Sequence, residues 1–164
     1  MDPTIKRGFT STAKNHEVRV HINAHLLGIC FTLFVIISAL KPELMKNSFF
    51  STQLALAIPF FLTSSFARSK SMAKPDSIKW DRFSYLTFIL GYGLLINSTG
   101  ILLSGICGKT IAILFFASNV ALALAYSIME VTDDRSKLAR RIVRDSFFAI
   151  ILLCLGLLPA LKAH

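Results

Sequence analysis

The side chains most able to do chemistry inside the apolar runs of this sequence are uncharged amides and hydroxyls. Asn97, Ser98 and Thr99 follow one another in the third long apolar run, Asn119 lies in the fourth, and Gln53 lies near the start of the second. An amide surrounded by hydrocarbon needs a hydrogen-bond partner or water, because lipid offers neither. We therefore predict that these residues line a polar pathway or bind a ligand, with helix packing as the alternative.

A pair of histidines lies at the entry to the first apolar run. His21 and His25 are four residues apart, so a helix would place both on one face. This spacing is compatible with a metal ion or with a pH-sensitive role. Two histidines at the entry of a helix are, however, typical of interfacial side chains. We predict no metal ion and no cofactor, and keep His25 as a candidate for the pathway lining.

Small residues recur at helical spacing in two consecutive runs. One stripe contains Gly93, Gly100, Ser104 and Gly108 around Asn97, and the other contains Ala117, Ala121 and Ala125. Small residues let helix backbones approach closely, and this packing replaces the missing hydrophobic drive between helices in lipid. We expect the two helices to pack together, or to dimerise, along these stripes.

Two features interrupt the apolar runs. Gly91-Tyr92-Gly93 has the sequence of a potassium-channel filter, but it lies inside one continuous span without a separate pore helix, which favours a helix here. The missing N–H of Pro59 predicts a kinked helix and a free carbonyl near Thr63, Ser64 and Ser65, whose hydroxyls would partly compensate for the lost bond. With Gln53, these hydroxyls would form a second polar region.

Carboxylates gather in two connecting loops. They are Asp76 and Asp81 in one loop and Glu130, Asp133 and Asp134 in the other. Such a group could hold a divalent ion for chemistry on lipid headgroups. Each acid has basic neighbours, however, and the spacing matches no metal motif. The sequence also lacks G-x-S-x-G, H-E-x-x-H and a phosphate-binding loop. We predict solvated loop charges and no enzyme.

The elements that must position these residues are membrane spans. The chain has 164 residues, of which 54% are hydrophobic and only 16% charged, and the apolar residues form long blocks. A helix crosses the hydrocarbon with about 20 apolar residues. The sequence predicts an all-α, polytopic membrane protein: a polar basic segment at 1–21, and one domain at 22–161 with five transmembrane helices at about 22–40, 49–67, 83–106, 110–129 and 142–161. The fifth apolar run is short, so a half-span that turns back is an alternative.

The distribution of Lys and Arg predicts orientation. Most of them lie in the N-terminal segment and in the loops 68–82 and 130–145, which fall on one side of a five-span protein. Basic loops stay in the cytoplasm, so we expect the N-terminus inside and the C-terminus outside, in a plasma or inner membrane. The net charge of +9 does not indicate nucleic acid, because the basic residues flank apolar spans instead of forming a folded basic face.

These patterns lead to three functional hypotheses. The first is an oligomeric channel or passive transporter for ions or small solutes, with a path built from uncharged polar residues. The second is a structural or assembly subunit that packs against partners through the small-residue stripes. The third is a lipid-modifying enzyme using the loop carboxylates. The expected partners are the lipid bilayer and either further copies of the chain or other membrane subunits.

Overall fold

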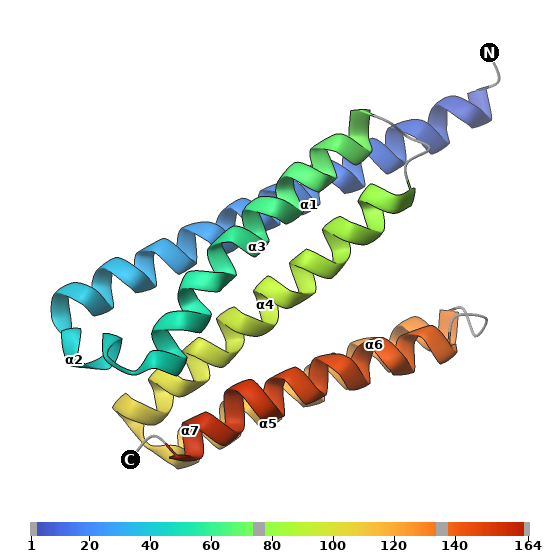
Figure 1. The fold of residues 1–164 in the computed structure, drawn as a ribbon. Coiled ribbons are helices and arrows are strands. Elements are labelled where there is room, and N and C mark those ends of the chain that lie inside the picture. Colours follow the sequence, from blue (N-terminus) through green and yellow to red (C-terminus); the bar gives the residue numbers. More distant parts are fainter. Residues whose placement is uncertain (1–2, 74–77, 134–137, 163–164) are drawn as a thin grey trace. The chain divides into compact units, whose positions relative to one another are not determined.

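The structure, a computed structural model, describes the backbone of residues 3–73, 78–133 and 138–162 and the side chains of residues 17–73, 78–129 and 145–162. The described residues form helices and no strand (Figure 1). In chain order these are α1 (Pro3–Leu40), α2 (Pro42–Met45), α3 (Ser48–Ala73), α4 (Ile78–Cys107), α5 (Lys109–Asp133), α6 (Leu138–Ile151), a π-helical segment (Leu152–Leu157) and α7 (Leu158–Lys162).

Five helical stretches are long and apolar enough to cross a membrane. They are Glu17–Leu40, Ser48–Ala73, Ile78–Cys107, Lys109–Met129 and Asp145–Lys162. The prediction of an all-α chain with five such helices is thus confirmed. The polar N-terminal segment is continuous with the first span, because α1 begins at Pro3. The helical path from Leu138 to Lys162 contains no loop, so the fifth stretch does not turn back within these residues.

The helix boundaries follow from local chemistry. Pro42 is the first residue of α2, where its missing N–H costs nothing. Asn47 caps α3, since its Oδ1 accepts hydrogen bonds from the backbone N–H groups of Phe49 at 3.1 Å and Phe50 at 3.2 Å. Gly108 separates α4 from α5 with a φ of 92°, a left-handed conformation that glycine adopts without strain.

The first of two compact units comprises Met1–Ile36 and Ala55–Tyr92. It contains most of α1, the later part of α3 and the first half of α4. Cys30, Phe61 and Ala67 are buried in its core. A Cβ atom on Gly91 would lie 3.1 Å from Cβ of Phe60, so the missing side chain allows α3 and α4 to approach. The span containing Gly91-Tyr92-Gly93 is helical throughout.

The second unit comprises Ile37–Leu54 and Gly93–His164. It contains α2, the start of α3, the second half of α4, and the helices from α5 to α7. Its core is organised around Phe116 of α5, which is 3% exposed. A Cβ on Gly100 would lie 2.2 Å from this ring, and a Cβ on Gly156 would lie 2.6 Å from it. Both glycines therefore provide the space that the ring occupies.

We expect Gly100→Ala and Gly156→Ala each to destabilise the protein by about 1–3 kcal/mol, because the added methyl group forces the buried Phe116 ring to move. Thermal unfolding in detergent would measure the loss. Gly28→Ala is the matched control, since its Cβ would meet nothing within 4 Å and alanine favours a helix. Equal unfolding midpoints for all three variants would show that the ring does not depend on the glycines.

Candidate functional site

Three polar side chains of α3 and α4 donate hydrogen bonds to the backbone of the fifth span. Gln53 Nε2 donates to the Leu155 carbonyl at 2.6 Å, and Asn97 Nδ2 donates to the Ile151 carbonyl at 3.2 Å. Ser104 Oγ donates to the Ala160 carbonyl at 2.7 Å. We call the Gln53 and Asn97 side chains, with the carbonyls of Ile151 and Leu155, the amide site.

The fifth span needs these donors because its own hydrogen-bond ladder is irregular. Pro159 has no N–H, and the carbonyl one α-helical turn before it belongs to Leu155. At the end of the π-helical segment the Leu158 N–H donates to the Leu153 carbonyl, five residues earlier. In an α-helix it would donate to the carbonyl four residues earlier. Ala160 lies in the last turn of α7, where carbonyls lack donors within the helix. Gln53 therefore gives the Leu155 carbonyl the donor that Pro159 lacks, and Asn97 and Ser104 add side-chain donors to the same span.

The two amides of the site keep an acceptor that no described residue satisfies. Asn97 is 0% exposed and Gln53 is 5% exposed. Asn97 Oδ1 and Gln53 Oε1 are both buried without a hydrogen-bond partner among the described residues. Leaving such an atom unsatisfied costs about 1–3 kcal/mol. The site therefore presents carbonyl-type oxygens that would accept hydrogen bonds from water or from a solute, or would coordinate a cation.

Gly156 lies against the Asn97 side-chain oxygen. A Cβ at this position would lie 2.2 Å from Asn97 Oδ1. Only glycine therefore lets the Asn97 amide lie against the fifth span in this orientation. Gly156 and Pro159 were missed by reasoning from the sequence, although a glycine and a proline inside an apolar run are a recognisable sign of an irregular helix.

The other predicted pathway residues do not share these interactions. Ser98 and Thr99 both donate to the Leu95 carbonyl, at 2.9 and 2.8 Å, and Asn119 donates to the Phe115 carbonyl at 2.9 Å. Each of these bonds stays within its own helix. His25 is exposed in the first unit, where its Nδ1 lies 2.7 Å from the His21 carbonyl oxygen. Of the predicted pathway residues described, only Gln53 and Asn97 bond to the fifth span, at carbonyls four residues apart.

The small-residue stripes have different surroundings on the two helices. On α4, Gly93, Gly100 and Ser104 are buried, and a Cβ on Gly93 would lie 3.3 Å from Ile151. Gly108 instead forms the turn after α4. On α5 the stripe of Ala117, Ala121 and Ala125 is exposed, and its first two alanines border an apolar groove that Leu152, Leu153 and Leu157 also line. The close approach of α4 to α5 occurs at Gly100 and Phe116.

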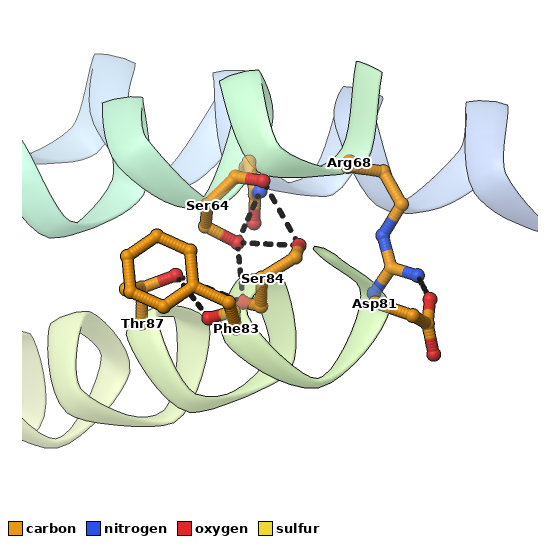
Figure 2. A network of polar contacts seen from close by, with 7 residues as sticks. Ser64, Arg68, Asp81, Phe83, Ser84 and Thr87 are labelled. Carbon is orange, nitrogen blue, oxygen red and sulfur yellow. Dashed lines mark hydrogen bonds and ion pairs between the residues drawn. The ribbon is translucent and has the colours of Figure 1, made fainter. Parts of the chain in front are cut away.

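A separate polar network joins the helices of the first unit (Figure 2). Ser64 Oγ donates to the Ser84 carbonyl at 2.8 Å, and Ser84 Oγ donates to the Ser64 carbonyl at 2.9 Å. Asn23 Nδ2 on α1 donates to Ser64 Oγ at 3.0 Å. Reasoning from the sequence missed Asn23 and grouped Ser64 with Gln53. The structure assigns Ser64 to this network and Gln53 to the amide site in the other unit.

Charged and aromatic residues join α3 to α4 near the same network. Arg68 Nη1 donates to Asp81 Oδ1 (Figure 2). Lys70 Nζ lies 4.6 Å from the centre of the Trp80 ring, which also meets Phe83 edge to face. A tryptophan beside basic residues at a span end is typical of the membrane interface.

Metal ligands do not gather in the described part of the chain. Among its residues there is no group of three or more His, Cys, Asp or Glu side chains able to hold a metal ion. The predicted loop carboxylates of Asp76, Glu130, Asp133 and Asp134 lie outside the described side chains. Asp81 is described, and it pairs with Arg68.

Pro159 and Gln53 should be energetically coupled. We expect Gln53→Leu to cost about 1 kcal/mol more in the native background than in Pro159→Ala, because alanine at 159 supplies a backbone N–H for the Leu155 carbonyl. A double-mutant cycle of unfolding free energies in detergent measures this difference. Ser98→Ala is the control partner, since Ser98 bonds only to its own helix. A coupling energy near zero for Gln53 and Pro159 would contradict this account of the site.

Comparisons with known protein families, with curated proteins and with solved structures give no match to this chain. Its function must therefore be argued from the amide site and the surrounding helices.

Proposed function

We propose that this protein is a small multi-pass membrane protein that acts as a channel or passive transporter for small solutes or ions. The observation that carries the proposal is the pair of buried oxygens, Asn97 Oδ1 and Gln53 Oε1, which have no hydrogen-bond partner among the described residues. Both amides hydrogen-bond at or beside the π-helical segment of the fifth span. Irregular backbone inside a span is tolerated where it is buried or lines a water-filled cavity.

The chemistry of the amide site suits weak binding of a solute or ion by uncharged groups. One N–H of each amide is used on a backbone carbonyl, whereas the amide oxygens remain as acceptors. Oxygens of this kind replace part of the hydration shell of a monovalent cation, or accept hydrogen bonds from a neutral solute. Broken helices carry the substrate and ion sites of many transporters for the same reason.

The proposal includes assembly and orientation. We propose that several copies build the path together, with the N-terminus and the basic loops in the cytoplasm of a plasma or inner membrane. The exposed alanine stripe of α5 supports contact between copies, since small residues allow helices to approach closely. The concentration of Lys and Arg in alternate loops supports the orientation.

A second candidate is a structural subunit that associates with other membrane chains. The observation in its favour is that Gln53, Asn97 and Ser104 each donate a hydrogen bond that holds the fifth span. In this case the polar residues serve packing alone. The candidate predicts that the protein purifies with another chain.

Flux through protein-containing liposomes tests the main proposal. We expect transport of at least one probe among Na⁺, K⁺, NH₄⁺, urea and glycerol above protein-free liposomes. Asn97→Leu should lower it at least about fivefold, because leucine removes the oxygen that replaces hydration, a loss of about 1 kcal/mol. Asn119→Leu is the matched control, since this amide bonds only within α5, and it should keep the native flux.

Two outcomes would contradict the proposal. The first is the absence of flux for every probe with protein that elutes as one species and unfolds in a single transition. The second is equal flux in Asn97→Leu and the native protein, since this would exclude the amide site from the path. Copurification of a second chain together with absent flux would favour the structural subunit.

A further inference from the structure

The Phe116 ring of α5 lies beside the Asn97 side-chain oxygen. A Cβ atom on Gly156 would lie 2.2 Å from Asn97 Oδ1 and 2.6 Å from this ring, so the oxygen and the ring border the same small space. The ring also occupies the space beside Gly100, which follows Asn97 by three residues on the same face of α4. All four residues belong to the second unit, and the oxygen and the ring are both buried. The ring therefore covers the oxygen from the side of α5.

The hydrogen-bond partner of the Asn97 amide fixes its orientation. Nδ2 donates to the Ile151 carbonyl at 3.2 Å, and a carbonyl oxygen can only accept a hydrogen bond. The atom on the Gly156 side must therefore be Oδ1, which is buried without a partner among the described residues. A molecule that binds at this oxygen has to donate a hydrogen bond or carry positive charge.

The same ring forms part of the apolar groove between α5 and the fifth span. This groove has a volume of about 360 Å³, and apolar side chains alone line it, among them Ala117, Ala121 and Leu153. Phe116 and Leu152 are its two buried lining residues, so they form its floor. Asn97 does not line the groove. The Phe116 ring thus stands between the groove and the Asn97 oxygen.

The lining of the groove distinguishes neutral solutes from ions. An ion that entered it would lose hydration and find no polar side chain in the wall, which is far more costly than the transfer of a neutral molecule. A small neutral solute with hydrogen-bond donors, such as urea or glycerol, loses less and regains a hydrogen bond at Asn97 Oδ1.

We propose that Phe116 is the barrier between the apolar groove and the Asn97 oxygen, and that a small neutral hydrogen-bond donor reaches this oxygen when the ring moves aside. The inference rests on the proposed transport and assigns its substrate to neutral solutes instead of ions. In this arrangement the size of the side chain at 116 sets access, and the Asn97 amide supplies the binding group.

Thiol labelling in neutral detergent tests the barrier without any measurement of transport. Asn97→Cys is introduced into the full chain together with Cys30→Ala, Cys107→Ala and Cys154→Ala, and mass spectrometry follows its modification by the neutral reagent methyl methanethiosulfonate. We expect Phe116→Leu to raise this rate at least about tenfold, because a smaller side chain leaves the position accessible. Phe116→Met, with a flexible side chain, is a second variant that should also raise it.

Phe50→Leu is the matched control for labelling. It makes the same substitution at a buried phenylalanine of the second unit that does not line the groove, and it should leave the rate unchanged. Equal acceleration by Phe50→Leu and Phe116→Leu would indicate general loosening and overturn the barrier. Unchanged rates in both Phe116 variants would overturn it too.

A charged reagent tests the route. In the Phe116→Leu chain, the sulfonatoethyl analogue should react at least about tenfold more slowly than the neutral reagent, each rate taken relative to a chain that keeps only the exposed Cys107. Equal relative rates would show an aqueous route and overturn the assignment to neutral solutes.

Flux through liposomes separates this inference from the proposed function. Phe116→Leu should raise the flux of urea or glycerol at least about threefold, and adding Asn97→Leu should abolish the gain. Native flux that does not respond to Phe116→Leu would overturn the barrier and leave the proposed transport standing. Labelling that responds to Phe116→Leu in a protein without flux for any probe would contradict the transport and leave the barrier standing.

Discussion

A carbonyl group inside a membrane span must find its donor within the protein, because hydrocarbon supplies none. In the fifth span Pro159 withholds the donor that an α-helix would give to Leu155, and Gln53 replaces it from α3. Asn97 and Ser104 add two more bonds to the same span from α4. In the second unit, the polar side chains of Gln53, Asn97 and Ser104 thus lie where they can reach the backbone carbonyls of this irregular helix.

The same constraint explains why glycine and a large ring meet here. The Asn97 amide reaches the Ile151 carbonyl only if the fifth span comes close, and Gly156 permits that approach. Phe116 then fills the space beside Gly156 and Gly100. Close packing leaves both amide oxygens of the site buried with acceptor capacity to spare, a property that Asn23 Oδ1 in the first unit shares.

In the first unit, the carbonyls find side-chain donors in another way. Ser64 and Ser84 exchange hydrogen bonds with each other's carbonyls, so two short hydroxyls join α3 and α4 without an irregular helix. Near this serine pair the connections become charged, with Arg68 bonded to Asp81 and Lys70 above Trp80. Such pairs suit the end of a span, where headgroups and water stabilise the charges that the hydrocarbon would exclude.

The sequence by itself determined the number and approximate limits of the spans, since twenty apolar residues in a row have few other uses. It also identified Asn97 and Gln53 as polar residues that require an explanation. It could not show that these two share one site while Asn119, Ser98 and Thr99 bond within their own helices. Nor could it show that Gln53 and Ser64 belong to different units. Hydropathy records how a residue partitions into lipid, whereas its hydrogen-bond partner depends on which helices are neighbours, and only the tertiary structure decides that.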